Sequence, residues 1–482
     1  MTEASETNTV VNIINETYIA LETNPLPTNI NSLLEKCLTN IRYLSSSPVN
    51  LDPLLRSIKA LLLDKEEYLF LDDQLMIEVM DHILKIAPFD LVLNVFTMKD
   101  IESALISNNT SLIKSALKVI ELSSPKSIFA SSPLFDLVLK LYFYEETDLD
   151  IINKIENLFR SLSSDELVAN KILVNNKPVL LSIKKGAALI NYSRMLELLS
   201  IFVVHINQAT FDEELFIITP EEIASLVDKD ILFFIQIINY YSKLLDDLLI
   251  DDFTRESKDW IYQYLEPIFN VLGQYYKKRD EYVEIKLFTL SYLFQIFRKV
   301  SYWNYENCFN LLDKHYLELN YQNEHIIDFL SFVNPKYLYE YHSEIIKEYA
   351  DIKPSRLSIL RNLVSNEKSF NLIKDNFTAE DILKMPYMEQ MVLLERMSQY
   401  KYCVKYILHT MPTILGNLVN FNGLHIIETE TVELREQTID NLIHFDVDLL
   451  GTWYAPLVDE LNKIKYHGIV KEVQPKVESM YL

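Results

Sequence analysis

Apolar and polar residues alternate along this chain with the 3.6-residue period of a helix, in segments of about 12 to 18 residues. Short runs of Ser, Pro, Asn and Asp separate the segments, as expected where helices begin and end. Two neighbouring segments, LIKSALKVI (112–120) and IINKIENLF (151–159), align without gaps 39 residues apart. That separation is close to the ~40–47-residue period of HEAT and armadillo helix pairs. The pattern predicts an all-α fold, an irregular HEAT/ARM-like solenoid of stacked helix pairs.

A second pattern recurs at longer separations. RLSILRNL (356–363), REQTIDNL (435–442) and KLFTLSYL (286–293) each begin with a basic residue and carry a small or β-branched residue three positions later and a leucine seven positions later. The third and seventh positions share one face of a helix, so this pattern is typical of the second helix of a HEAT pair. We expect second helices, which would line the inner curve of the stack, at 110–123, 149–162, 188–205, 230–246, 283–300, 355–365 and 432–444.

Domain organisation follows from the same pattern, because no long low-complexity linker interrupts it. We expect one continuous HEAT-repeat solenoid over residues 11–465. A flexible acidic tag (1–10) would precede it, and a loose tail (466–482) would follow it. Consecutive pairs would share one elongated core, since the apolar face of each pair is too wide to bury alone.

Glycine is scarce, with six residues in 482 against a usual ~7%. Phosphate-binding loops and tight hairpins rely on glycine because it tolerates positive φ. The sequence also contains no GxGxxG, GxxxxGK[ST], GxSxG or HExxH motif, which are the common signatures of nucleotide, hydrolase and zinc-protease sites. We therefore predict no enzyme activity, no catalytic residue, no metal site and no cofactor.

The formal net charge is −24. Such an acidic chain repels DNA, RNA and anionic lipid and suits a protein partner with a basic surface. Three cysteines without a CxxC spacing give no disulfide framework, and the N-terminal residues are polar and acidic, unlike a signal peptide. The longest apolar stretch, DILFFIQIINYYSKLL, is interrupted by Gln236 and Asn239 and is too short for a membrane span. We expect a cytoplasmic protein, with the nucleus as a further compartment.

Two of the expected second helices, INYSRMLELLSIFVV (190–204) and ILFFIQIINYYSKLLDD (231–247), are apolar nearly all round yet contain scattered polar residues. In a stacked solenoid such a helix leaves one narrow ridge for a partner, and Tyr and Arg there often carry interface energy. The equally open alternative is that these residues only satisfy hydrogen bonds between repeats. The candidate partner-binding residues on the inner helices are Asn153, Glu156, Tyr192, Arg194, Glu197, Gln236, Asn239, Tyr240 and Lys243.

The stretch LRNLVSNEKSFNLI (360–373) places an arginine and a glutamate among apolar residues and at first resembles a site. We interpret it as a joint between two helices. Leu360 and Leu363 would belong to the stripe of one helix, the chain would turn near Asn366, and Phe370 would begin the apolar face of the next.

Several tracts resemble, in the same order, those of the fungal proteasome regulatory-particle assembly chaperones, a HEAT-repeat family also named for DNA mismatch repair (high spontaneous mutability). These tracts are LPTNINSLLEKC (26–37), INYYSKLL (238–245), LRNLVSNEKSFNLI, MPYMEQMVLLERMSQYKY (385–402), HTMPTILGNL (409–418) and TWYAPLVDE (452–460). The resemblance covers nearly the whole chain and rests on collinearity rather than on one diagnostic motif.

The resemblance implies a C-shaped HEAT solenoid that takes part in assembly of the base of the 26S proteasome. Its concave face would bind the C-terminal domain of an AAA+ ATPase subunit, in a precursor with a second ATPase subunit and a large scaffold subunit. The chaperone would block premature docking on the core particle. Neither direct nucleic-acid binding nor membrane binding is expected, and no catalytic residue is implied.

Two other classes of function are compatible with a helical scaffold. One is an accessory protein in DNA mismatch repair, although a chain of charge −24 lacks a basic DNA-binding stripe. The other is an importin-like adaptor that binds an extended peptide. An adaptor of that kind would have a regular Trp/Asn ladder, whereas Trp260, Trp303 and Trp453 all lie outside the expected inner helices.

Overall fold

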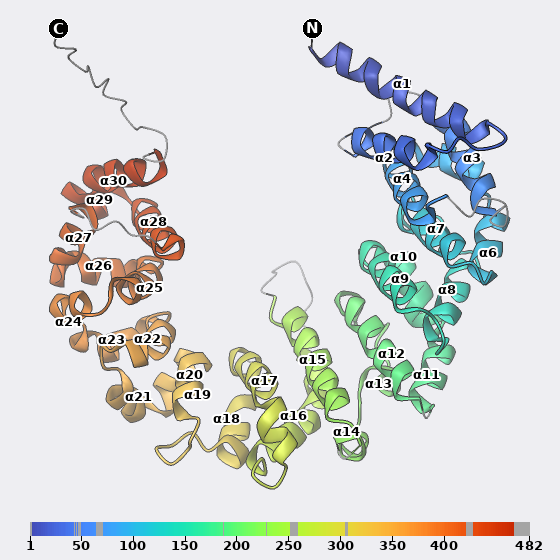
Figure 1. Ribbon diagram of the computed structural model, residues 1–482. Helices are drawn as coiled ribbons and strands as arrows, with labels where there is room; N and C mark the ends of the chain where they lie inside the picture. Colours follow the sequence, from blue (N-terminus) through green and yellow to red (C-terminus); the bar gives the residue numbers. More distant parts are fainter. Residues whose placement is uncertain are drawn as a thin grey trace, which may run out of the picture. The chain divides into compact units, whose positions relative to one another are not determined.

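The computed structural model describes residues 2–42, 44, 46, 50–63, 71–186, 188–227, 229–250, 259–303, 307–420 and 428–466. Within these ranges every regular element is helical. No helix there combines the length and the apolar character that a bilayer crossing requires. The fold is therefore the predicted all-α stack of helix pairs (Figure 1).

The chain divides into two compact units, an N-terminal unit of residues 1–265 and a C-terminal unit of residues 266–482. The boundary falls inside helix α16 (Tyr262–Lys277). Helix α1 (Thr2–Glu22) includes residues 2–10, for which the sequence suggested a flexible tag. The tail expected at 466–482 lies outside the described residues, apart from the last residue of α30 (Tyr454–Tyr466).

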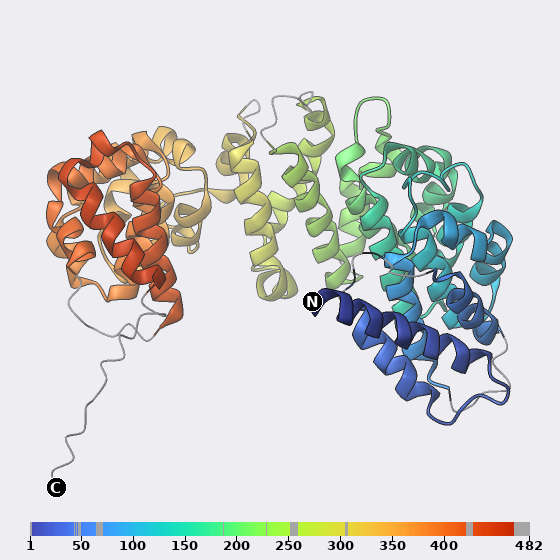
Figure 2. The ribbon, with the colours of Figure 1, turned by 90° about the horizontal axis from the view of Figure 1, so that it is seen from above.

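In the N-terminal unit the second helices form one row in which each member contacts the next. A second row packs along it, as Figure 1 and the view turned by 90° in Figure 2 both show. The row of second helices consists of α2 (Ile30–Ile41), α4 (Asp73–Ile86), α7 (Thr110–Glu121), α9 (Leu149–Leu162), α12 (Leu189–Ile201) and α15 (Ile231–Leu248). The row beside it includes α1, α3 (Asp52–Leu63), α5 (Phe89–Val95), α6 (Met98–Ile106), α8 (Leu134–Phe143), α11 (Lys177–Lys185), α13 (Glu213–Phe216) and α14 (Pro220–Val227).

Local chemistry determines where these helices begin. Asn109, Asp148 and Asp230 are the N-cap residues of α7, α9 and α15, and each side chain accepts a hydrogen bond from a backbone N–H of the first turn. Such caps satisfy amides that have no partner inside the helix and contribute about 1 kcal/mol each. One apolar stripe of each helix then faces the shared core; in α9 it includes Ile155 and Phe159, both 0% exposed.

The C-terminal unit repeats this arrangement. Consecutive contacts join α19 (Ile326–Phe332), α22 (Leu357–Leu363), α25 (Tyr387–Ser398), α28 (Thr429–Ile443) and α30. Helix α17 (Leu290–Tyr302) packs on α19 through the rings of Phe294 and Phe329, whose centroids lie 5.3 Å apart. Contacts of α20 (Pro335–Tyr341) with α23 (Glu367–Ile373), and of α24 (Ala379–Lys384) with α27 (Pro412–Val419), form the other row.

All seven ranges predicted for second helices coincide with helices, namely α7, α9, α12, α15, α17, α22 and α28. The segment predicted at 283–300 begins with a π-helical turn at Ile285–Thr289 before α17. The prediction missed α2, α4, α19, α25 and α30, which belong to the same rows. None of them repeats the spacing of a basic residue, a small or β-branched residue and a leucine that is found at 286–293, 356–363 and 435–442.

The stretch 360–373 is the joint between α22 and α23. Leu360 and Leu363 are fully buried on α22, and the side chain of Asn366 caps α23 by accepting hydrogen bonds from two backbone amides. Phe370 is 1% exposed and starts the buried face of α23. The interpretation as a scaffold joint is confirmed.

Candidate partner-binding face

Helices α9, α12 and α15 are consecutive members of the row of second helices, and they carry all nine residues that the sequence suggested for partner binding. Each helix buries a broad face against its neighbours. The exposed side of each helix is available to a partner. Figure 1 shows the three helices one after another in the row.

Arg194 corrects the sequence-based assignment because it is buried, with an exposed fraction of 7%. Its Nη1 donates hydrogen bonds to the backbone carbonyls of Tyr142 and Tyr144, each at 2.9 Å. The Tyr142 hydroxyl donates in return to the Arg194 carbonyl at 3.0 Å. Arg194 therefore satisfies carbonyls at the C-terminal end of α8, where a cation is favoured.

Tyr192 and Tyr240 are also buried, with exposed fractions of 5% and 1%. The Tyr192 ring packs on Phe233, with 5.2 Å between the ring centroids. The Tyr240 hydroxyl donates to the Phe216 carbonyl at 2.9 Å. Burial raises the pKa of both phenols well above their ordinary value, so both remain neutral. Together with Arg194, they join the helices to each other rather than face a partner.

The buried role of Arg194 leads to a stability prediction. Arg194→Met should lower the free energy of unfolding by about 3 kcal/mol, because one buried and one partly buried carbonyl lose a charged donor. The matched control is Arg160→Met on α9, at a side chain that is 48% exposed, where the loss should stay below about 1 kcal/mol. Urea denaturation followed by circular dichroism measures both. Equal losses would contradict the structural role assigned to Arg194.

Four charged side chains form a ladder across the exposed side of the three helices. Arg160 lies 3.0 Å from Glu156 on its own helix and 2.9 Å from Glu197 on α12. Lys243 on α15 lies 3.1 Å from the other oxygen of Glu197. Burial would raise the pKa of Glu197, but hydrogen bonds and charges from Lys243 and Arg160 outweigh it and hold the pKa below its ordinary value. Glu197 is therefore a fixed anion between two cations.

Polar side chains extend this ladder. Asn153 is exposed on α9, Asn239 is half-buried on α15, and the Gln236 side-chain amide donates to the Ser193 carbonyl of α12 at 2.9 Å. Gln236 thus joins two helices while it remains half-buried. We name the whole set the α9–α12–α15 face, and its members are Asn153, Glu156, Arg160, Glu197, Gln236, Asn239 and Lys243.

Sequence analysis missed Arg160, although Glu156 was a candidate. Arg160 follows Glu156 by four residues on α9, the spacing at which opposite charges pair on a helix surface. This four-residue spacing could have identified Arg160 from the sequence alone. The additional pairing of Arg160 with Glu197, 37 residues later, depends on how the repeats stack.

Two cysteines outside this face, Cys37 on α2 and Cys403 on α26 (Lys401–Thr410), are buried. Cys37 is buried, and burial raises the pKa of its thiol to about 11. Burial likewise raises the pKa of the Cys403 thiol, so neither is the reactive thiolate that nucleophilic catalysis needs. Across the part of the chain that the structure describes, no three His, Cys, Asp or Glu side chains are grouped to hold a metal ion.

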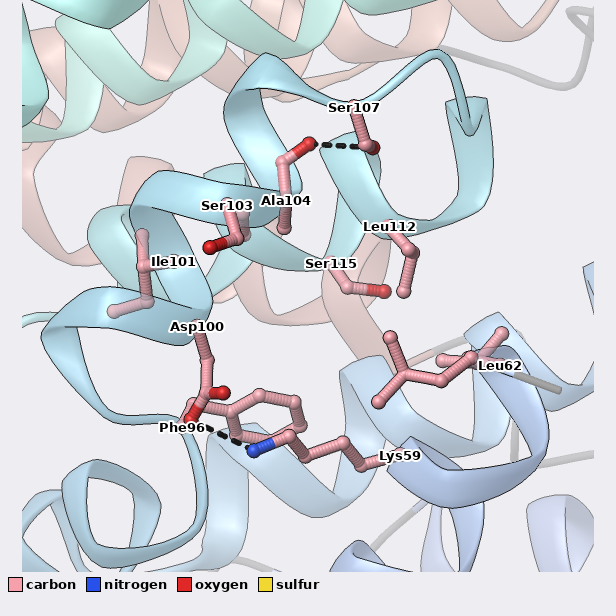
Figure 3. Close-up of a pocket in the computed structure, with 12 residues that line it drawn as sticks. Lys59, Leu62, Phe96, Asp100, Ile101, Ser103, Ala104, Ser107, Leu112 and Ser115 are labelled. Carbon is pink, nitrogen blue, oxygen red and sulfur yellow. Dashed lines mark hydrogen bonds and ion pairs between the residues drawn. The ribbon is translucent and has the colours of Figure 1, made fainter.

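A cavity of about 240 Å³ lies elsewhere in the N-terminal unit, between α3, α6 and α7 (Figure 3). Leu62 and Leu112 lie along one side of it, and Ile101 and Ala104 contribute apolar surface from α6. At one end the Lys59 ammonium is 2.7 Å from the Asp100 carboxylate and also donates to the Val95 carbonyl at 2.8 Å. Because the lysine is already paired, the cavity presents mainly apolar surface.

Comparisons with known proteins cover both units. Family models described as DNA mismatch repair protein HSM3, N terminal domain, and DNA mismatch repair protein HSM3, C terminal domain, match residues 11–246 and 258–482. The DNA mismatch repair protein HSM3 of Eremothecium gossypii is 35% identical over 94% of this chain and 94% of its own length. The proteins of that name from Candida glabrata and Saccharomyces cerevisiae are 35% and 34% identical over 94% and 95% of both chains.

A solved structure from work on a phosphorylation switch that controls the interaction between cadherin and beta-catenin aligns with 94% of this chain and 90% of its own. Its TM-score of 0.34 and 12% identity are too low to support an argument. The family models and the curated relatives, by contrast, span nearly the whole sequence in one order. The chain therefore belongs to the HSM3 family.

Proposed function

We propose that this protein is a non-enzymatic chaperone for assembly of the base of the proteasome regulatory particle. It binds the C-terminal domain of an AAA+ ATPase subunit through the α9–α12–α15 face and blocks premature docking on the core particle. A second ATPase subunit and a large scaffold subunit complete the precursor, in the cytoplasm or the nucleus. The partner class comes from the collinear resemblance of the sequence to proteasome assembly chaperones.

The observation that carries the proposal is the ladder formed by Glu156, Arg160, Glu197 and Lys243. Its side chains come from three stacked helices and are held by ion pairs of 2.9 to 3.1 Å. A fixed alternation of charges can select a complementary surface, and little side-chain freedom remains to be lost on binding. A small helical domain with the opposite alternation of charges fits such a face.

Exchanging the charges of Glu197 and Lys243 tests this face. The pair Glu197→Lys with Lys243→Glu keeps an ion pair between α12 and α15 but reverses the pattern offered to a partner. We expect binding to the preferred ATPase C-terminal domain to weaken at least about tenfold, or about 1.4 kcal/mol. The exchange also places a cation beside Arg160. The melting temperature should nevertheless fall by no more than about 4 °C, because ion pairs between partly exposed side chains contribute little to stability.

The matched control exchanges Glu344 and Lys347, an exposed pair in the C-terminal unit, and should leave binding unchanged. Pull-downs and calorimetry against each of the six ATPase C-terminal domains provide the measurement. No preference among the six domains would refute the chaperone function. A loss of melting temperature that matches the loss of affinity would instead make Glu197 and Lys243 structural.

A second candidate function is an accessory scaffold role in DNA mismatch repair, because the relatives carry that name. The net charge of −24 favours an indirect role through a protein partner over contact with DNA. Titration with duplex DNA at low salt distinguishes the two. Tight binding that falls steeply as salt rises would indicate direct contact with phosphates.

A further inference from the structure

Four exposed aliphatic residues recur along one edge of the N-terminal unit, 41 to 43 residues apart. They are Ile106, Leu149, Ile190 and Leu232, with exposed fractions of 68%, 72%, 48% and 71%. Their spacing equals the length of one repeat, so each pair of helices contributes one. We call this set the edge stripe.

The edge stripe lies where first helices end and second helices begin. Ile106 is the last residue of α6, four positions before α7 starts, and Leu149 is the first residue of α9. Ile190 and Leu232 are the second residues of α12 and α15. These helices follow one another in the row of second helices, whose members run side by side in Figures 1 and 2.

Side-chain contacts relate the beginnings of these helices in two neighbouring pairs, α7 with α9 and α12 with α15. Lys114 near the start of α7 is 3.3 Å from Asp150 in the first turn of α9. The Gln236 side chain donates a hydrogen bond to the Ser193 carbonyl. Gln236 lies four residues after Leu232 on α15, and Ser193 lies three residues after Ile190 on α12. Between α9 and α12, Arg160 pairs with Glu197, and these residues lie 11 and 7 positions beyond Leu149 and Ile190. The four aliphatic groups thus lie at the same end of the row of second helices.

A continuous line of exposed aliphatic groups is unusual on a folded surface and marks an interaction site. The apolar cavity between α3, α6 and α7 extends it, because Ser107 and Leu112, which flank the start of α7, line that cavity (Figure 3). The N-terminal unit therefore offers apolar contact along this edge that its own folding does not use.

Charge along the same edge specifies the partner further. Glu145, Glu146, Asp148 and Asp150 surround Leu149 and are all exposed. Asp230 precedes Leu232, and Lys229 is the exposed basic residue beside it. The caps Asp148 and Asp230 also offset the positive ends of α9 and α15. A partner with basic residues beside its apolar ones complements this surface.

Spacing indicates the form of that partner. Neighbouring packed helices lie about 8–10 Å apart, and seven residues of an α-helix rise about 10.5 Å. An amphipathic helix laid across the stack with an apolar residue at every seventh position would therefore place one against each stripe residue. We propose that the edge stripe binds a basic amphipathic helix of another protein, at the N-terminal ends of the helices that carry the α9–α12–α15 face.

The test uses the full chain and a fluorescein-labelled synthetic peptide of about 28 residues, or about 42 Å as a helix. The peptide has Leu at every seventh position among Lys and Ala. A second peptide has the same composition, with its four Leu residues spaced five positions apart. A third peptide has Glu in place of Lys. Fluorescence anisotropy at low salt should show at least about tenfold tighter binding of the first peptide than of either other.

The triple variant Leu149→Gln, Ile190→Gln, Leu232→Gln should weaken binding of the first peptide at least about tenfold. The matched control is Leu167→Gln with Val174→Gln, two exposed aliphatic residues that follow the C-terminal end of α9, and it should bind as the wild type does. All the substituted side chains are exposed, so the melting temperature followed by circular dichroism should be unchanged. The single variant Leu149→Gln gives a milder second test of peptide binding.

Three outcomes would overturn the proposal. The wild type could show no preference for the seven-residue spacing, or bind the acidic peptide equally well. The triple variant could bind as the wild type does. Light scattering could show that the wild type self-associates and the triple variant does not, which would make a second copy the occupant. Unchanged binding of the triple variant to the ATPase C-terminal domain would show that this site and the proposed function are independent.

Discussion

Replacing Arg435 with methionine is expected to lower the free energy of unfolding of the C-terminal unit by about 3–5 kcal/mol. Arg435 on α28 is 5% exposed and lies 2.7 Å from the Glu460 carboxylate on α30, which is 8% exposed. The Arg435 Nη2 that contacts Glu460 also donates a hydrogen bond to the Leu418 carbonyl at 2.8 Å. The substitution leaves a buried carboxylate with only Lys463, at 3.2 Å, as its basic partner.

The stability lost in Arg435→Met should depend on pH. Burial would raise the pKa of Glu460, but Arg435 and Lys463 outweigh burial and hold it below its ordinary value. The pair therefore stabilises the folded chain above the unfolded-state pKa of about 4.3, and this stabilisation is lost as the pH falls through the folded-state pKa. The difference between Arg435→Met and the wild type should accordingly shrink on acidification.

Urea denaturation at several pH values measures this difference. The double variant Arg435→Met with Glu460→Gln removes both charges and should lose less stability than Arg435→Met alone. If the free energy of unfolding of Arg435→Met were within about 1 kcal/mol of the wild-type value at neutral pH, the Arg435–Glu460 pair would not stabilise the fold as described.

Asp313→Asn is expected to cost about 3 kcal/mol, the second of the two large effects. Asp313 is 4% exposed. Its Oδ1 accepts from the Leu319 amide at 2.8 Å, and its Oδ2 accepts from the Tyr337 hydroxyl at 2.6 Å. His342 Nε2 also lies 2.6 Å from Oδ2, and it must carry the hydrogen because an ionised carboxylate only accepts. In Asp313→Asn, an NH₂ group in place of Oδ2 would face the Tyr337 hydroxyl and the His342 N–H, and both donors would lose their acceptor.

The pKa of Asp313 again fixes the sign of the pH dependence. Burial would raise it, yet hydrogen bonds from His342, Tyr337 and the Leu319 amide hold it below its ordinary value. The network stabilises the folded chain above the unfolded-state pKa of about 3.9 and loses this contribution as the pH falls through the folded-state pKa. The free energy of unfolding of Asp313→Asn should therefore fall less on acidification than that of the wild type.

Asp375→Asn is the matched control for Asp313→Asn, because Asp375 is an exposed carboxylate in the same unit. It should change the stability by less than about 0.5 kcal/mol. Chemical denaturation near neutral pH and in mild acid compares the two variants. Equal effects at both positions would mean that the contacts of Asp313 do not contribute as described.

The positions of helices could be predicted from the sequence because apolar periodicity and caps act locally. The ranges 149–162 and 230–246 match α9 and α15 nearly to the residue. The exposed side of a helix was harder to predict, because α12 is apolar nearly all round. Its periodicity could not show that Tyr192 and Arg194 point into the core while Glu197 remains partly exposed.

The partners of polar residues could not be predicted, because stacking brings together residues far apart in sequence. Glu197 pairs with Arg160, 37 residues earlier, and with Lys243, 46 residues later. The edge stripe was missed for another reason. An exposed leucine in the first turn of an amphipathic helix, such as Leu149, has the same local pattern as a core residue, and only the packed structure distinguishes the two.

The burial of the three thiols has a practical consequence for experiments. Cys37, Cys308 and Cys403 are all buried, so maleimide dyes or spin labels should attach slowly to them in the folded chain. One cysteine introduced at an exposed position such as Leu149 or Lys243 would then be modified selectively, without removal of the native cysteines. Fluorescence or electron-spin reporters could thus follow each candidate surface separately in otherwise unaltered protein.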